Sequence, residues 1–136
     1  MREDLFRGDS FHLEIDGVSA AGFVRCAGLE SSFDVLTYAE GGATKPRWFR
    51  GAESPGRILL ERGLCRDRSL WDWYRSGDAR RGAILLLDGG GRERARWSFR
   101  SGFPCRWQGP HLDARRAEVA LELVEIVHEG IEWQAS

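Results

Sequence analysis

The chain has 136 residues, of which 42% are hydrophobic and 30% charged, and its 20 basic and 21 acidic side chains leave a formal net charge of −1. This length predicts one ordinary domain over 1–136 with a core of its own, and it excludes a two-domain enzyme architecture. The balanced charge lacks the broad positive field that non-specific nucleic-acid binding requires, and no apolar run approaches the roughly 20 residues of a membrane span. We therefore do not expect polyanions or lipid as main partners.

The first nine residues, MREDLFRGD, are mostly charged and polar. They contain neither the apolar segment nor the small-residue cleavage site of a secretory signal. We therefore expect 1–9 to be a flexible N-terminus and not a signal peptide. The tripeptide Arg7-Gly8-Asp9 occurs in integrin ligands, but nothing else in the chain indicates adhesion.

The three cysteines, Cys26, Cys65 and Cys105, are spaced about 40 residues apart and form no CxxC pair. That spacing is typical of reduced, buried thiols and not of a disulfide framework or a zinc site. The sequence predicts no metal and no cofactor.

The first half of the chain alternates apolar and polar residues in short segments that end at glycines. Such alternation predicts strands over 11–15, 18–26, 31–40 and 57–62. Asp16-Gly17 is typical of a two-residue hairpin turn between the first two of these strands.

A glycine-rich stretch, GGATKPRWFRGAESPG, separates the third and fourth predicted strands at 41–56. It is too long for a tight turn, and it carries the exposed-looking pair Trp48-Phe49. Long loops inside compact domains are usually functional or mobile. We therefore expect a long functional loop over 41–56.

One short amphipathic helix is predicted over 68–76. Asp67 or Ser69 can cap its start, Gly77 follows its end, and Leu70, Trp73 and Tyr74 recur at one-turn spacing. Two tryptophans, Trp71 and Trp73, flank Asp72, an arrangement typical of core packing on one side and partner contact on the other.

The second half predicts a hairpin of strands 83–87 and 93–99 around a turn at 88–91. The final segment 118–129 is long, and its apolar alternation changes phase, so either a bulge lies near Leu123 or both faces are covered. We expect two strands' worth of pairing there. The fold class is mainly β, with about seven strands and one short helix in a small sandwich or partly open barrel.

An enzyme would need converging polar groups, and the three histidines, His12, His111 and His128, lie in no catalytic motif. His128 and Glu129 are adjacent on a predicted strand and point to opposite faces, so they form no direct dyad. The triple glycine at 89–91 precedes a strand, so it lacks the helix N-terminus of a phosphate site. We therefore predict that the chain is not an enzyme.

The strands 31–40 and 57–62 carry little of the charge that protects exposed sheet edges from association. We infer that these edges pair with neighbouring copies of the same chain, and a ring of sheets that closes on itself would satisfy them all.

The order of these segments resembles the tail tube protein family of contractile phage tails and extracellular contractile injection systems. Each motif alone is weak, whereas their order and spacing together are specific. The motifs are FHLEIDG (11–17), AGF (21–23), CAGLE (26–30), Tyr38, EGG (40–42), LERG (60–63), LWDW (70–73), LLD (86–88), ARW (95–97), GFP (102–104), WQGP (107–110) and HEG (128–130).

The resemblance implies a structural subunit that completes a continuous inner β-barrel on hexamerisation. Six copies would form a ring, rings would stack into a hollow tube with DNA or protein cargo in its lumen, and sheath and baseplate proteins would be partners. It also implies assembly in the bacterial cytoplasm and then residence in a phage tail or a phage-tail-like particle. Phage and free-standing particle stay open as alternatives.

The resemblance also implies roles for individual residues. Lumen-facing candidates are Val35, Thr37, Ala39, Leu59 and Glu61; Leu36, Tyr38, Ile58 and Leu60 would face the domain core. The loop 41–56 would touch the next ring through Lys45, Trp48, Phe49 and Arg50, and the outer helix would present Leu70, Trp71, Trp73 and Tyr74.

The chain departs from the family at several of these positions. Relatives often carry charge at the positions of Thr37 and Ala39 and usually a polar residue at that of Leu59. Where this loop has Trp48-Phe49-Arg50, relatives usually have an aliphatic residue and a proline. We hypothesise either a specialised ring adjoining the baseplate or a tube for an unusual cargo. Two other classes stay open: a monomeric small β-barrel that binds an apolar ligand between Phe99, Trp97 and Trp107, and, ranked last, a hydrolase that depends on His128.

Overall fold

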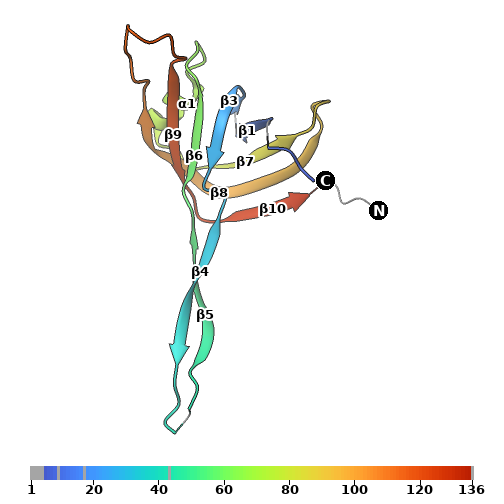
Figure 1. Ribbon diagram of the computed structural model, residues 1–136, viewed down its shortest axis with the longest axis vertical. Coiled ribbons are helices and arrows are strands. Elements are labelled where there is room, and N and C mark those ends of the chain that lie inside the picture. The colour runs from blue at the N-terminus through green and yellow to red at the C-terminus, as the bar shows by residue number, and fades with distance from the viewer. Residues whose placement is uncertain (1–4, 9, 17, 43, 136) are drawn as a thin grey trace.

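The computed structural model describes residues 5–8, 10–16, 18–42 and 44–135. It contains strands and one helix, as Figure 1 shows. These are β1 (Phe11–Ile15), β2 (Val18–Ala20), β3 (Phe23–Ala27), β4 (Ser31–Tyr38), β5 (Arg47–Pro55), β6 (Ile58–Gly63), α1 (Ser69–Ser76), β7 (Arg80–Leu87), β8 (Glu93–Gln108), β9 (Leu121–Val127) and β10 (Ile131–Ala135).

The body is one antiparallel sheet in the order β2-β1-β7-β8-β9-β6-β3, with β10 paired to β8. The 16-residue β8 belongs to both halves of this sheet, because its first part pairs with β7 and β10 and its last part with β9. Ser101 in its middle has a φ of 49°, and the sheet curves around the core at this strand (Figure 1). The mainly β, partly open fold is therefore confirmed.

The core lies inside the curved sheet and follows from the alternation of side chains along each strand. Leu13, Ile58, Leu60, Val124 and Ile126 are all at most 1% exposed. The helix α1 adds Leu70 and Trp73 to the same cluster. The helix ends as predicted, because Gly77 adopts the left-handed conformation and donates its N–H to the Trp73 carbonyl at 3.0 Å.

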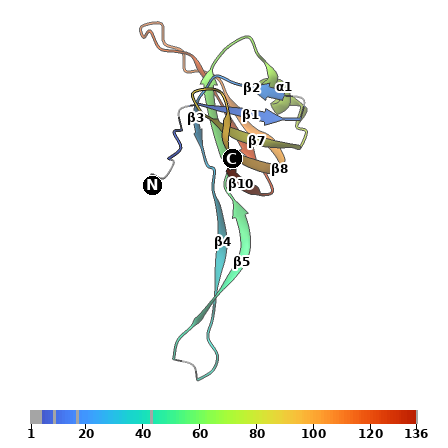
Figure 2. The ribbon, with the colours of Figure 1, turned by 90° about the vertical axis from the view of Figure 1, so that its right-hand side faces the viewer.

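The strands β4 and β5 form a separate two-stranded sheet that projects from the body as a long hairpin (Figures 1 and 2). The expectation of a loop over 41–56 is therefore wrong for Arg47–Pro55, which is a strand. Its glycine-rich composition misled the prediction, because Gly51 lies at a bulge opposite Asp34 and Gly41 and Gly42 lie beyond the end of β4.

The hairpin continues the body strands β3 and β6 in one register. Ala27 pairs with Leu59, Ser31 pairs with Pro55, and three residues on each side lie between the two pairs. Gly28 permits this close approach, because it has a φ of 87° and a Cβ there would lie 1.8 Å from the Arg57 carbonyl oxygen. The hairpin is thus an extension of the sheet that β3 and β6 belong to.

Three other expectations need correction. The predicted strand 18–26 is split into β2 and β3 around Gly22, whose φ is 80°, and the two parts pair with different strands. In β9 the buried residues are Glu122, Val124 and Ile126, and the bulge lies on the partner strand β8 between Pro104 and Arg106. The sequence also missed β10 as a separate strand.

The cysteines are free, but only one of them is partly buried. Cys65 and Cys105 are exposed, so the expectation of buried thiols is wrong for both. Cys26 is half-buried on β3, and burial raises the pKa of its thiol to about 11.

Candidate assembly surfaces

The β4–β5 hairpin has two faces, which its register defines. Val35 pairs with Arg50 and Thr37 with Trp48, whereas Leu36 pairs with Phe49. Side chains of directly opposed residues lie on the same face of a sheet. The first face therefore carries Val35, Thr37, Trp48 and Arg50, and the second carries Leu36 and Phe49.

Aromatic contacts reinforce both faces. On the first, the Arg50 guanidinium lies 4.1 Å from the centre of the Phe33 ring. On the second, the rings of Tyr38 and Phe49 meet edge to face with their centres 6.4 Å apart. The single chain nevertheless leaves six large apolar side chains of the hairpin 41–68% exposed: Phe33, Val35, Leu36, Tyr38, Trp48 and Phe49. Apolar surface of this extent on a long unpaired ribbon is typical of an interaction surface.

These positions revise the sequence-based assignments. Val35 and Thr37 share a face with Trp48 and Arg50, so the lumen and inter-ring candidates are not separated by face. Leu36 and Tyr38 were expected to face the domain core, but they are 55% and 53% exposed because β4 pairs with β5, beyond the body. Ala39 follows the end of β4 and Lys45 precedes β5, both exposed near the tip.

A second surface is the outer face of the four-stranded part of the sheet, β3, β6, β9 and the end of β8. The candidates Leu59 and Glu61 lie here, between the buried residues Ile58, Leu60 and Arg62 of the same strand. Two ion pairs cross this face, Arg25 with Glu61 at 3.8 Å and Arg57 with Glu125 at 3.5 Å. Arg25, Arg57 and Glu125 could not be predicted for this face, because only the strand pairing places them beside Leu59 and Glu61.

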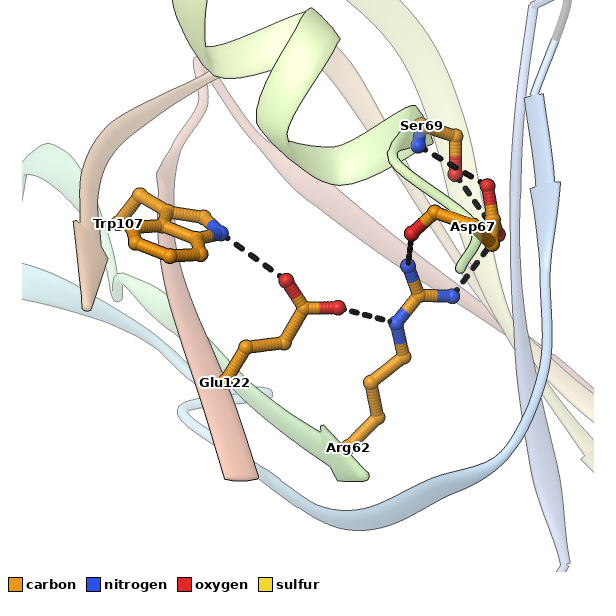
Figure 3. Close-up of polar contacts among 5 residues, drawn as sticks. All are labelled: Arg62, Asp67, Ser69, Trp107 and Glu122. Carbon is orange, nitrogen blue, oxygen red and sulfur yellow. Dashed lines mark hydrogen bonds and ion pairs between the residues drawn. The ribbon is translucent and has the colours of Figure 1, made fainter. Parts of the chain in front are cut away.

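A buried polar network joins β6, β8 and β9 to the start of α1, as Figure 3 shows. Arg62 on β6, 2% exposed, donates from Nε to Glu122 on β9 at 2.6 Å and from Nη1 to the Asp67 carboxylate at 3.0 Å. Trp107 on β8 donates its indole N–H to the other oxygen of Glu122 at 3.0 Å. Asp67 in turn accepts the backbone N–H of Ser69, the first residue of α1, at 2.9 Å. The N-cap position itself is Arg68, which makes no side-chain cap bond, so the expectation that Asp67 or Ser69 caps the helix is wrong.

The electrostatics of this network favour its charged form. Burial opposes the charge on Arg62, but the hydrogen bonds that it donates to Glu122 and Asp67 outweigh burial and raise the pKa of the guanidinium. The Ser69 backbone N–H is the largest influence on Asp67 and, with Arg62, lowers the pKa of that carboxyl despite burial. The network therefore connects β6 and β9 of the four-stranded part to the start of the helix through paired charges.

The helix candidates divide into two groups. Leu70 and Trp73 are 1% exposed and belong to the core. Trp71 and Tyr74 are half-buried, and the Trp71 ring lies 4.8 Å from that of Trp107 in an edge-to-face contact. Only Trp71 and Tyr74 of the four therefore offer surface to a partner.

The described residues contain no cluster of three or more His, Cys, Asp or Glu side chains arranged to hold a metal ion. Within the same part of the chain, no helix has the length and apolarity to cross a membrane. Phe99, one of the residues expected to line a ligand cavity, is 1% exposed and packs in the core cluster together with Trp97.

His128 is buried at the end of β9, where the hairpin joins the body. Its Nδ1 accepts the Gly130 N–H at 3.2 Å, and its Nε2 has no hydrogen-bond partner. Burial lowers the pKa of His128 below its ordinary value of 6.5, and Arg100 adds to this while Glu53 opposes it. The unfolded chain therefore binds a proton to His128 at a higher pH than the folded chain does.

We predict that acidification from about pH 7 to about pH 5 destabilises the subunit through His128. Stability is lost as the pH falls below 6.5 towards the folded-state pKa, with a slope of at most about 1.4 kcal/mol per pH unit. Urea unfolding measured across this pH range gives the free energy of unfolding at each pH. This free energy should fall less steeply with decreasing pH in His128→Gln than in the wild type. The exposed His111→Gln should keep the wild-type slope; equal slopes in all three proteins would contradict the prediction.

Comparisons with known proteins agree with this architecture. A family model described as T4-like virus tail tube protein gp19 matches residues 8–132. A chain of the PVC sheath-tube complex, from an extracellular contractile injection system in its extended state, superposes with a TM-score of 0.90 at 20% identity, covering 98% of this chain and 94% of that chain. A comparison with curated protein sequences gave no match.

Two further structures share the fold. A chain of the anti-feeding prophage cap, which is a tube-terminating cap, has a TM-score of 0.90 at 17% identity, with 100% of this chain and 95% of that chain covered. Hcp1 from Flavobacterium johnsoniae has a TM-score of 0.62 at 13% identity, with 93% and 96% covered.

Proposed function

The chain belongs to the T4-like virus tail tube protein family, and from this premise we propose that it is a structural subunit of the inner tube of a contractile injection apparatus, with six copies in each ring. The observation that carries the proposal is the exposed β4–β5 hairpin, whose apolar residues find no cover within the described residues of one chain. The role is structural and requires no catalysis.

The topology supplies two free edges for closing a ring. The four-stranded part of the sheet runs β3, β6, β9 and then residues 103–108 of β8, and each neighbouring pair is antiparallel. Because directions alternate over an even number of strands, the edge at β3 of one copy would meet the edge at 103–108 of the next copy as another antiparallel pair. Identical contacts of this kind would close into a cyclic ring without leaving an exposed edge in it.

The outer face of this four-stranded part would line the lumen. In that arrangement Leu59 and Glu61 face the bore together with Arg25, Arg57 and Glu125, so the channel wall carries both signs of charge. The helix α1 lies on the other side of the core and would face outward, towards the sheath. The lumen would hold DNA or protein cargo.

The proposal includes the setting of the tube. Sheath and baseplate proteins would contact it, and the subunit would be made in the bacterial cytoplasm before it becomes part of a phage tail or an extracellular particle. The aromatic hairpin supports a specialised ring adjoining the baseplate, because it offers more apolar contact than a repeating ring with an aliphatic residue there. Cryo-electron microscopy of the particle would contradict this last point if the chain repeats along the whole tube.

Purification at high concentration tests the main proposal. Light scattering coupled to size exclusion should show ring-sized species, and negative-stain images should show annular particles or tubes. A persistent monomer that takes up a hydrophobic probe would overturn the proposal and favour the ligand-binding module instead.

We predict that Val35→Lys leaves the subunit folded, because Val35 is 64% exposed and lies outside the core. The free energy of unfolding should change by less than about 0.5 kcal/mol. If the Val35 face lines the bore, rings still form and the channel density in two-dimensional class averages changes. Folded Val35→Lys subunits that form no rings would show that this face lies in an interface instead.

A further inference from the structure

The β4–β5 hairpin joins the body through two short connections, residues 28–30 and 56–57, which we call the hairpin root. The two connections are held together by the Gly56 N–H, which donates to the Glu30 carbonyl at 3.0 Å. Among the described residues, neither β4 nor β5 forms a ladder with a strand of the body. The orientation of the hairpin therefore depends on the few groups that pack against its root.

One of these groups, His128, makes a hydrogen bond that only a neutral ring can accept. His128 is 9% exposed, and its Nδ1 accepts the Gly130 N–H at 3.2 Å. The single proton of the neutral imidazole is then on Nε2, which has no hydrogen-bond partner in the described part of the chain. A second proton would lie on Nδ1 and face the Gly130 N–H, so two donors would point at each other. The protonated ring therefore cannot keep its present place.

The charges around His128 come from both sides of the hairpin root. Glu53 on β5 and Arg100 on β8 both lie within 4 Å of the place that a Cβ on Gly130 would take. Burial is the main reason that the pKa of His128 lies below 6.5; among the groups on other elements, the Gly56 backbone and Glu53 raise this pKa and Arg100 lowers it. A positive ring would therefore move away from the body strand β8 and towards β5. The other charged side chains near the root are those of Glu30, Arg57, Glu129 and Glu132.

We infer that His128 is a pH-sensitive switch at the hairpin root: the neutral ring holds the root against the body, and protonation releases the root and prevents ring assembly. The part of the inference that concerns assembly rests on the proposed function. The release differs from the loss of global stability described above, because it is a local opening that requires less free energy than unfolding of the core.

Hydrogen exchange of the hairpin amides tests the release in the subunit itself. Between about pH 7.5 and about pH 5, the protection factors of β4 and β5, corrected for the intrinsic pH dependence of exchange, should fall at least about threefold in the wild type. They should change by less than about 1.5-fold in His128→Gln, which has no group to protonate there. Hairpin protection that does not depend on pH in the wild type would overturn the inference, because His128 would then act only through unfolding of the whole subunit.

Two substitutions at exposed positions should change this effect in opposite directions, which a purely structural role would not do. Arg100→Gln removes a charge that disfavours the protonated ring, so the loss of hairpin protection at low pH should be smaller than in the wild type. Glu53→Gln removes a carboxylate that favours the protonated ring, so the loss should be larger. A change in the same direction in both variants would contradict the inference.

Ring assembly is the second readout. Because the same switch acts in every copy of a ring, the fraction of subunits in rings, measured by sedimentation velocity, should fall at least about tenfold between about pH 7.5 and about pH 5. His128→Gln should lose less than about twofold, and the exposed control His111→Gln should behave as the wild type does. Wild-type rings that persist at the lower pH would overturn the inference. Wild-type protein that forms no rings at either pH would overturn the proposed function instead, while hairpin exchange would still test the switch.

Discussion

The double substitution Ile58→Asp with Leu60→Asp should prevent the subunit from folding. Both side chains are at most 1% exposed and point from β6 into the core cluster. Each aspartate would remove the burial of a branched aliphatic chain, about 2–5 kcal/mol, and would place a carboxylate where no partner can satisfy it. The combined cost of the two aspartates is close to or above the roughly 5–15 kcal/mol free energy of unfolding of a typical domain.

The alternation along β6 provides a control. Leu59 lies between the two substituted residues and points to the opposite, half-exposed face. Leu59→Lys would place a charge beside Glu61 and Glu125 without entering the core, so it should fold with a loss of at most about 1 kcal/mol. Far-UV circular dichroism and cooperative urea unfolding distinguish the proteins. A double variant that unfolds cooperatively at the wild-type midpoint would refute the assignment of this face to the core.

Local signals in the sequence were sufficient for the elements whose contacts are local. The alternation in Phe11–Ile15, the turn at 88–91 and the helix that ends at Gly77 all depend on residues within a few positions of one another. In the turn, for example, the Asp88 side chain accepts the Gly90 and Arg92 N–H groups, both at 2.9 Å. Such turn chemistry is readable because it is encoded in adjacent residues.

Non-local pairing could not be predicted in this way. β5 has a composition typical of a loop, and only its ladder with β4 holds it as a strand. Glu122 carries a charge, and nothing adjacent to it in the sequence indicates burial, yet it is 3% exposed because Arg62, sixty residues earlier, pairs with it. The faces of the hairpin depend on the bulge between Phe33 and Val35, which shifts the register by one residue and which no local signal specified.

The substitution Arg62→Ala should lower the free energy of unfolding by about 3–5 kcal/mol, because it leaves Glu122 buried without its charged partner. Glu122→Gln should cost less, about 1–3 kcal/mol, because an amide oxygen still accepts one of the two donors, Arg62 Nε or the Trp107 indole N–H. Urea unfolding at neutral pH measures both effects. A loss below about 1 kcal/mol in Arg62→Ala would show that the network contributes little to stability.

The double variant Arg62→Met with Glu122→Leu separates the two roles of the network. Replacing a buried ion pair by apolar residues of similar volume is often neutral or stabilising, so this protein should recover most of the stability that Arg62→Ala loses. Asp67 would then lose both hydrogen bonds from Arg62, one to its carboxylate and one to its backbone carbonyl, but keep the Ser69 N–H, so the start of α1 would be held by two bonds fewer. We therefore expect restored global stability together with faster amide hydrogen exchange in the first turn of α1. Unchanged exchange in the first turn would mean that the packing of Leu70 and Trp73 alone positions the helix. The contact from Arg62 on β6 to Asp67 would then not hold the start of α1 in place.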